Sequence, residues 1–262
     1  MDFGAPITSR SNARVKALRA SFSGKASRPG EGVGIEGEHL VAEALRSGFE
    51  FETVFLRLGS ERVLERASLA GLGKAKVVVL SADVFASAVE TASPQGIAAT
   101  ILLREVVVAS EVSGPVLVLE ELQDPGNFGT LLRSAEAFGA SLVMVTPGTV
   151  SQWNPKVMRA SAGSVFRVAV VRGTLADIAA RLVGVEVYAA VAQMDGAVSL
   201  LETQFGARCA LMVGNEGAGL SAEAVALARH RVRIPCAVES LNAAVAGSTL
   251  LYEAMRQREV AR

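Results

Sequence analysis

Three short polar segments in the second half of the chain carry the residues best suited to chemistry. Residues 124–133 read DPGNFGTLLR, residues 214–221 read GNEGAGLS, and residues 233–242 read RIPCAVESLN. Their glycines allow close backbone approach, and their Asn, Arg and Glu side chains supply amide, guanidinium and carboxylate groups. Each segment alone also fits an ordinary turn, or a helix cap at Ser240. Only their combination indicates a site.

The elements around these segments predict an α/β sheet that would bring them together. The apolar stretches PVLVLEEL, SLVMVTP, FRVAVV, EVYAAVA and CALMVG are each followed by a turn signal and a helical segment. Continuous apolar strands separated by helices predict a parallel sheet covered on both faces. Ligands of such sheets bind outside the carboxyl ends of the strands. We expect Asn127 and Ser221 to cap the helices that follow two of these strands.

The first hundred residues predict a separate, smaller α/β sandwich. Its expected elements are helices at 38–47, 60–69 and 83–91, strands at 53–58, 76–80 and 97–103, and a first helix in SRSNARVKAL capped by Ser9 or Ser11. Gly32, Gly34 and Gly37 spell G-x-G-x-x-G, but that nucleotide motif requires a strand directly before it. The preceding KASRPGE gives none, so we expect a flexible loop there. Residues 104–114 read as a linker.

Composition excludes several classes of protein. The chain has 262 residues, 26 basic and 26 acidic side chains, two His and two Cys. A disulfide scaffold and a Cys/His zinc module are excluded, and a signal peptide or membrane span is not expected. We predict a cytoplasmic protein. The neutral total hides a basic start, because residues 1–30 hold six basic side chains and one acidic one.

Together the three segments resemble the signature of the SpoU (TrmH) family of RNA ribose 2′-O-methyltransferases, in the SPOUT superfamily. That signature reads N-x-G-x-x-x-R-[ST]-A, then G-[NST]-E-G-x-G, then I-P followed by S-L-N. The chain carries NFGTLLRSA (127–135), GNEGAG (214–219) and RIPCAVESLNAAVA (233–246). Residues 154–170 resemble a segment of the rRNA-directed branch. The third block is short, which implies a tighter loop at the cofactor.

The resemblance implies the fold, the cofactor and the partners. It implies an α/β chain with a C-terminal trefoil-knotted parallel-sheet SPOUT domain over residues 109–262. A small α/β substrate-binding domain, similar to a ribosomal RNA-binding protein, would cover residues 1–108. The cofactor would be S-adenosyl-L-methionine, with no metal. The substrate would be RNA, with 23S-type large-subunit rRNA favoured over tRNA, and the chain would form a homodimer through the knotted domain.

The resemblance also assigns roles to individual residues. Arg133 would position the target ribose and phosphate; the pKa of a guanidinium, about 12.5–13.8, makes the role of general base less favourable. The implied catalytic residues are Arg133, Asn127, Glu216, Ser240 and Asn242. The implied cofactor contacts are Leu211, Met212, Gly214, Asn215, Ile234 and Leu241. The implied RNA contacts are Arg10, Asn12, Arg14, Lys16, Arg19, Lys156 and Arg159.

Two alternatives from other classes stay open at this point. A non-catalytic RNA-binding assembly factor would be expected to have lost one of the five catalytic residue types, and all five are present. A nicotinamide-dependent oxidoreductase would need a glycine fingerprint directly after a strand and an acid about 20 residues later. Within the favoured class, the target nucleotide and the choice between housekeeping and antibiotic resistance stay open.

Overall fold

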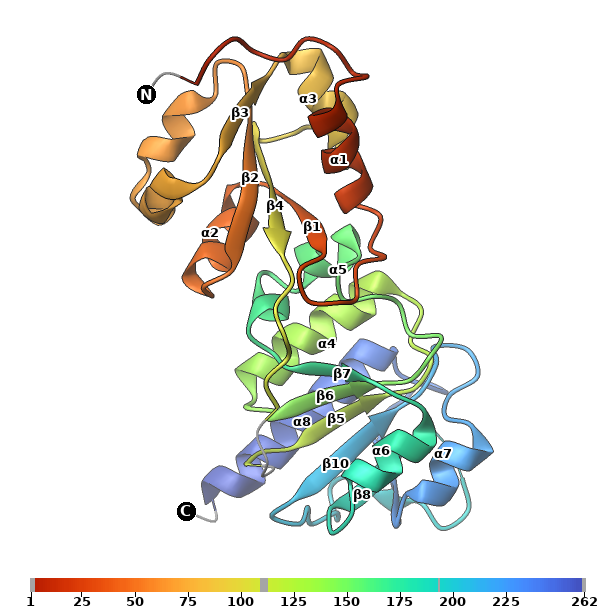
Figure 1. The fold of residues 1–262 in the computed structure, drawn as a ribbon. Coiled ribbons are helices and arrows are strands. Elements are labelled where there is room, and N and C mark those ends of the chain that lie inside the picture. Colours follow the sequence, from red (N-terminus) through yellow and green to blue (C-terminus); the bar gives the residue numbers. More distant parts are fainter. Residues whose placement is uncertain (1–2, 109–112, 193, 261–262) are drawn as a thin grey trace. The chain divides into compact units, whose positions relative to one another are not determined.

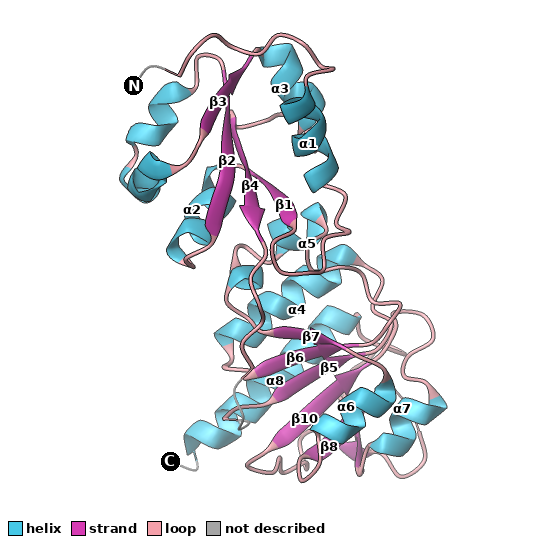
Figure 2. Cartoon of the chain, in the orientation of Figure 1, coloured by secondary structure: helices cyan, strands magenta, loops and turns pink. Residues whose placement is uncertain are grey.

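The computed structural model describes residues 3–108, 113–192 and 194–260, and the chain divides into two compact units. The first unit contains the chain up to Glu105 together with Ser151–Phe166, and the second contains Val106–Val150 and Arg167–Arg262. Figure 2 shows that both units mix helices and strands. The expected domain boundary between residues 108 and 109 borders residues 109–112, which lie outside the described residues, so it stays a prediction.

The first unit is built on a four-stranded sheet of order β1-β4-β2-β3 (Figure 1). Strand β4 is antiparallel to β1 and β2, and β2 is parallel to β3. Its elements are α1 (Ala13–Ser21), β1 (Gly32–Glu36), α2 (Glu38–Arg46), β2 (Glu50–Arg57), η1 (Glu61–Glu65), η2 (Ala67–Lys74), β3 (Val77–Leu80), α3 (Ala82–Ala88), β4 (Ile97–Leu102), α5 (Pro155–Ala160) and η3 (Ser164–Phe166).

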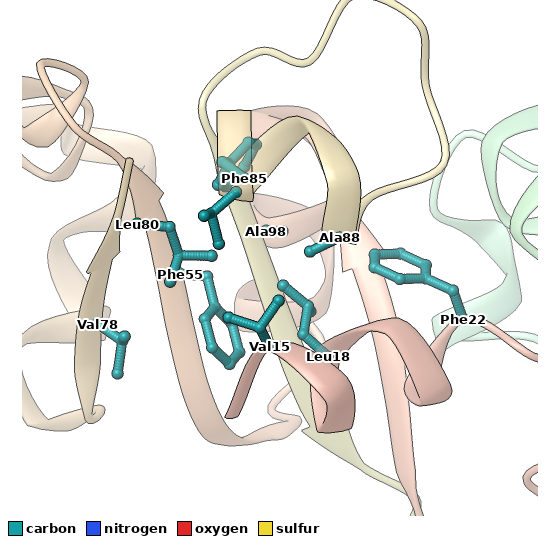
Figure 3. Packing of buried hydrophobic residues seen from close by; sticks show 10 residues of the cluster. Val15, Leu18, Phe22, Phe55, Val78, Leu80, Phe85, Ala88 and Ala98 are labelled. Carbon is teal, nitrogen blue, oxygen red and sulfur yellow. The ribbon is translucent and has the colours of Figure 1, made fainter. Parts of the chain in front are cut away.

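Strand β1 corrects the expectation of a flexible loop at the glycine motif. Val15 and Leu18 of α1 are fully buried with Phe55, and Phe22 joins the same cluster (Figure 3). A Cβ on Gly34 would lie 2.5 Å from the hydroxyl of Ser21 and 2.9 Å from the ring of Phe22. Glycine is therefore required because the end of α1 packs directly on the strand.

Two further local expectations are corrected by the structure. Asn12, not Ser9 or Ser11, caps α1, since its side chain accepts a hydrogen bond from the backbone of Arg14. The helix expected at 60–69 is replaced by the two 3₁₀ helices η1 and η2. The prediction missed both because a cap and a 3₁₀ turn depend on local geometry that several nearby polar residues could equally satisfy.

Residues 151–166 pack on the first unit, although they follow strand β6 (Leu142–Val145) of the second. The rings of Trp153 and Phe166 lie 6.2 and 5.3 Å from the ring of Phe49, both in edge-on geometry. The guanidinium of Arg104 lies 4.5 Å above Phe49 and donates a 3.0 Å hydrogen bond to the Phe166 carbonyl. The turn at Gly163 fits against the side chain of Glu43, where a Cβ would clash. This segment is thus an integral part of the first unit.

The second unit confirms the predicted parallel sheet. Its strand order is β7-β6-β5-β10-β8-β11-β9, and every described pair is parallel. The helix pairs α4–α8 and α6–α7 pack on opposite faces of the sheet (Figure 1). Its elements are β5 (Val116–Leu119), α4 (Pro125–Ala137), β6 (Leu142–Val145), β7 (Val170–Arg172), α6 (Leu175–Arg181), β8 (Glu186–Ala190), β9 (Val198–Ser199), β10 (Cys209–Val213), α7 (Ala222–Leu227), β11 (His230–Arg233) and α8 (Ala243–Val260).

The sequence pattern explains the centre of this sheet. All residues of β5, β6 and β10 are buried, as expected for strands covered by helices on both faces. Strand β10 lies between β5 and β8, with Val213 in register with Leu119. The segments that follow β5 and β10 therefore start side by side. Among the described residues, no helix is both long enough and apolar enough to span a membrane.

Candidate active site

The carboxylate of Glu216 joins the loop after β10 to the loop after β5. Its Oε1 accepts hydrogen bonds from the backbone N–H of Asp124 and from Nδ2 of Asn127, both at 3.0 Å. Its Oε2 accepts a 3.3 Å hydrogen bond from the backbone N–H of Gln123. One side chain thus fixes the start of α4 against the loop at residues 214–221, called here the glycine-rich loop. Glu216 contacts Asn127 and the backbone of the loop after β5, and among the described residues it has no hydrogen bond to Arg133.

Asn127 connects all three sequence segments through its amide. Its Nδ2 donates to Glu216, and its Oδ1 accepts a 3.0 Å hydrogen bond from Nδ2 of Asn242. The Oδ1 of Asn242 in turn accepts from the backbone N–H groups of Ala244 and Val245, so Asn242 caps α8. The result is a continuous chain of hydrogen bonds, Asn242–Asn127–Glu216, in which each amide has one orientation.

The residue that caps α4 differs from the prediction, as the Asn242–Asn127–Glu216 hydrogen bonds require. Asp124 caps the helix by accepting a 2.7 Å hydrogen bond from the backbone N–H of Asn127, and Pro125 occupies the first turn. Asn127 was expected to be the cap and is instead inside the first turn. Its side chain is consequently free to bridge Glu216 and Asn242.

The environment of Glu216 keeps its carboxyl group ionised. Partial burial raises its pKa, but the hydrogen bonds donated by Asn127 and by the backbones of Glu216, Asp124 and Gln123 outweigh that effect and lower the pKa from its ordinary value. Hydrogen bonds to a charged acceptor are stronger than bonds between neutral groups. At neutral pH the ionised carboxylate of Glu216 therefore holds the loop that precedes α4.

The glycine-rich loop closes on itself and leaves room for no larger residue at its start. The backbones of Asn215 and Gly219 exchange hydrogen bonds of 3.0 and 2.9 Å, and Oδ1 of Asn215 accepts from the backbone of Gly217. A Cβ on Gly214 would lie 2.2 Å from the carbonyl carbon of Gly219. The Nδ2 of Asn215 also donates to the carbonyl of Glu121, which adds a second link to the β5 loop.

Glu120 is a buried acid in this region that the sequence analysis did not identify. Its carboxylate accepts hydrogen bonds from the backbone N–H and the hydroxyl of Ser221, at 2.8 and 2.6 Å. Ser221 caps α7, as predicted, by accepting from the backbone of Ala224. Glu120 therefore holds the far end of the glycine-rich loop. The available signal was an acid at the end of an otherwise apolar strand, PVLVLEEL.

A cavity of about 400 Å³ opens beside this loop. Four predicted cofactor residues, Gly214, Asn215, Ile234 and Leu241, line it together with Glu216 and Ser240. The side chains of Leu211 and Met212 are buried within β10 and do not line the cavity. The prediction missed one wall, which follows β8 and consists of Ala190, Val191, Ala192 and Met194. Its signal was the stretch EVYAAVA, whose end must lie at the same sheet edge.

The cavity fits a nucleoside-type ligand with a flat base and polar groups. The apolar side chains after β8 form one wall of the cavity, and the loop that begins at Gly214 contributes backbone atoms to another. Ligand pockets of this kind combine apolar walls with a few directional polar groups. Among the described residues, no cluster of three His, Cys, Asp or Glu side chains could hold a metal ion.

The other predicted residues lie apart from the hydrogen-bonded chain. Arg133 is exposed on α4, and Ser240 is exposed at the cavity; neither side chain has a described hydrogen-bond partner. In the first unit, Asn12 caps α1, Arg10 lies 3.7 Å from Asp83, and Arg19 donates to the Ser87 carbonyl. The predicted RNA contacts that are exposed without an ion pair among the described residues are Arg14, Lys16, Lys156 and Arg159.

The second unit is thus a parallel α/β fold with a nucleoside-sized site at the carboxyl ends of its strands, a class in which many ligand-dependent enzymes are found. The chain belongs to the SpoU rRNA Methylase family, whose model matches residues 114–252. A model of the MRM3-like substrate binding domain matches residues 12–99. Both findings confirm the family inferred from the three segments and the substrate-binding domain that was expected to precede them.

Relatives over nearly the whole chain support the same assignment. The chain is 35% identical to the 23S rRNA (guanosine(2553)-2′-O)-methyltransferase RlmP of Bacillus subtilis, over 94% of this chain and 97% of that protein. An uncharacterized tRNA/rRNA methyltransferase of Synechocystis is also 35% identical, over 97% and 94%. The AdoMet-bound rRNA methyltransferase of Sinorhizobium meliloti is 28% identical, with a TM-score of 0.82 over 96% and 97% of the two chains.

Proposed function

We propose that this protein is an S-adenosylmethionine-dependent methyltransferase that modifies a ribose 2′-hydroxyl of large-subunit rRNA. The observation that carries the proposal is the Asn242–Asn127–Glu216 chain, which joins three separate segments beside a nucleoside-sized cavity. The B. subtilis relative is named for ribose methylation of 23S rRNA, and the S. meliloti relative binds AdoMet. Both relatives span nearly the whole chain, so the likeness covers both units.

The cavity residues, among them Ile234, Leu241 and the wall after β8, would hold the cofactor. When bound, S-adenosylmethionine supplies a sulfonium methyl group, and its S–C bond breaks as the O–C bond to the ribose forms. The chain contributes a loop held in one position for that ligand to bind, because Glu120 and Glu216 fix both ends of the loop that begins at Gly214. Alignment of two reacting groups supplies about 7–11 kcal/mol toward a barrier.

Arg133 would bind the RNA phosphate and orient the target hydroxyl, since it is exposed on α4 with its guanidinium free to contact a ligand. A planar, permanently charged guanidinium suits phosphate and is a poor proton acceptor at neutral pH. Ser240, at the cavity, would contact the reacting groups, and Asn127 and Asn242 would hold its surroundings in place. The hydroxyl proton would leave to solvent or to a phosphate oxygen near Arg133.

The trefoil knot, the homodimer and a cytoplasmic location are part of the same proposal. A dimer through the second unit would cover part of α8, where Val245 and Tyr252 are about half exposed (51% and 49%). Tyr252 packs edge-on against Phe138, which directly follows the neighbouring helix α4, with ring centroids 5.6 Å apart. Together these side chains make part of the surface formed by α4 and α8 apolar.

The test is transfer of labelled methyl groups from S-adenosylmethionine to unmodified rRNA and tRNA pools. We expect label in rRNA and resistance of one linkage to alkaline cleavage. Arg133→Ala should abolish transfer yet keep cofactor binding by calorimetry, whereas Arg181→Ala, which removes an exposed arginine from α6, should change neither. Label found only in tRNA would show that the substrate is tRNA and not rRNA. Cofactor binding without transfer to either pool would contradict transfer to free RNA and favour an assembly factor or an assembled-particle substrate.

A further inference from the structure

The structure brings together two groups of basic residues that are far apart in the sequence. Residues 10–28 and residues 156–159 are separated by more than a hundred positions, yet both lie in the first unit. Helices α1 and α5 each contact strand β1. In Figure 1, the loop that leaves α1 passes next to α5 before it enters β1. The two groups therefore lie on elements that both contact β1, the edge strand of the four-stranded sheet.

The two segments that carry these groups meet at Gly24. A Cβ on Gly24 would lie 3.2 Å from the Cα of Asn154 and 3.6 Å from the carbonyl oxygen of Trp153. Lys25 follows Gly24 directly, and Lys156 lies two residues after Asn154, which caps α5. Gly24 has a positive φ of 68°, so a larger residue would strain the turn and disturb this contact.

Five exposed cations lie on α1, on the loop that leaves it, or on α5. None of them has an ion pair among the described residues. By contrast, Arg10 lies beside Asp83, and Arg19 is directed to Ser87 on α3. Lys25 was not among the predicted RNA contacts, and it lies between the two groups that were. The five residues, called here the β1-edge patch, are Arg14, Lys16, Lys25, Lys156 and Arg159.

We propose that the β1-edge patch is one continuous surface that binds the sugar–phosphate backbone of the RNA substrate, with Lys25 connecting its two halves. Unpaired Lys and Arg side chains on one edge attract the closely spaced phosphates of structured RNA and release their counterions. Such contacts position the RNA and do not read its sequence. The proposal rests on the proposed RNA substrate, and it assigns that role to a surface to which α5 contributes.

The salt dependence of RNA binding tests the patch. Affinity for an unmodified transcript of large-subunit rRNA would be measured over a range of KCl concentrations with the full chain. We expect Lys25→Gln/Arg159→Gln to weaken binding about tenfold or more near 100 mM salt and to reduce the salt slope by about 2, because each substitution removes one cation from an RNA phosphate. Lys25→Gln alone should reduce the slope by about 1, and Arg10→Gln by clearly less.

A matched control comes from the other edge of the same sheet. Arg62 and Lys76 flank the connection into β3, the strand opposite β1 in the sheet order, and both are exposed. Arg62→Gln/Lys76→Gln removes the same two charge types and should leave the slope unchanged. Trp153 is the only tryptophan of the chain and packs near Phe49, so unchanged emission in the free variants shows that the segment carrying α5 remains docked.

The outcomes separate this proposal from the proposed function. An unchanged slope in the Lys25/Arg159 variant, or an equal loss in the control variant, would overturn the patch even if methyl transfer proceeds. A reduced slope in a chain that transfers no methyl group would support the patch and refute the methyltransferase activity. Equal effects of Arg10→Gln and Lys25→Gln would refute the assignment of Lys25 as the link.

Discussion

The Asn242–Asn127–Glu216 chain makes a specific prediction for Asn127→Asp. Nδ2 of Asn127 lies 3.0 Å from Oε1 of Glu216, and the substitution places a second carboxylate oxygen there. Two like charges at that distance repel by about 1.4 kcal/mol in water, and removal of a hydrogen bond to a charged group costs about 1.5–3 kcal/mol. Glu216 is exposed, so solvent screening favours the lower values. We expect local destabilisation of about 2–3 kcal/mol.

Hydrogen exchange measures this effect where it occurs. The backbone N–H groups of Gln123 and Asp124 are protected by Glu216, so they report directly on its position. A loss of about 2–3 kcal/mol corresponds to roughly 30- to 150-fold faster exchange of these amides. Peptides from β4 in the first unit should not change. Asn127→Ala, which removes the bond but adds no charge, should show about half of the effect in kcal/mol.

The pH dependence gives a second check with a defined sign. The native pKa of Glu216 is lowered, so its hydrogen bonds stabilise the loop above its unfolded pKa, about 4.3. That stability is lost as the pH falls through the native pKa. The same protonation removes the repulsion in Asn127→Asp, so the ratio of exchange rates should shrink toward one in acid. A ratio near one at pH 7, or a ratio that grows in acid, would refute the reasoning.

Two further substitutions test the glycine-rich loop from its two ends. Gly214→Ala forces a Cβ within 2.2 Å of backbone and should weaken S-adenosylmethionine binding by about 10- to 100-fold in calorimetry, whereas Gly217→Ala meets no atom closer than 3.6 Å and should bind normally. Glu120→Gln removes the charge that Ser221 donates to and should weaken cofactor binding about tenfold, while the exposed neighbour Glu121→Gln should not. Normal affinity in Gly214→Ala or Glu120→Gln would show that the loop is not held in this way.

Much of the second unit could be predicted because its signals are local. Strands such as 116–119 and 209–213 are apolar along their whole length, and buried parallel strands require that pattern. The sheet rule then placed the residues that follow them at one edge. The sequence could not reveal that Asp124 and not Asn127 caps α4. Both residue types are good caps, and the bridge from Glu216 to Asn242 decides between them.

The parts that were not predicted depend on contacts between distant segments. Gly34 lies in a strand because the end of α1 packs against it, and no neighbour in the sequence indicates that packing. Glu120 resembles any acid at the end of a strand until Ser221, a hundred residues later, folds back on it. The wall formed by Ala190, Val191, Ala192 and Met194 has no polar side chain to mark it, because these apolar residues contribute by leaving space.

The packing of residues 151–166 on the first unit has a consequence for synthesis of the protein. A ribosome makes the chain from its N-terminus, and early segments begin to fold as they emerge. The ring of Phe49 and the guanidinium of Arg104 obtain their partner Phe166 only after β5, α4 and β6 have been translated. A product truncated near residue 108 would also lack Lys156 and Arg159. Nascent and prematurely terminated chains would therefore have only part of the proposed β1-edge patch, which would limit their competition with the complete enzyme for its substrate.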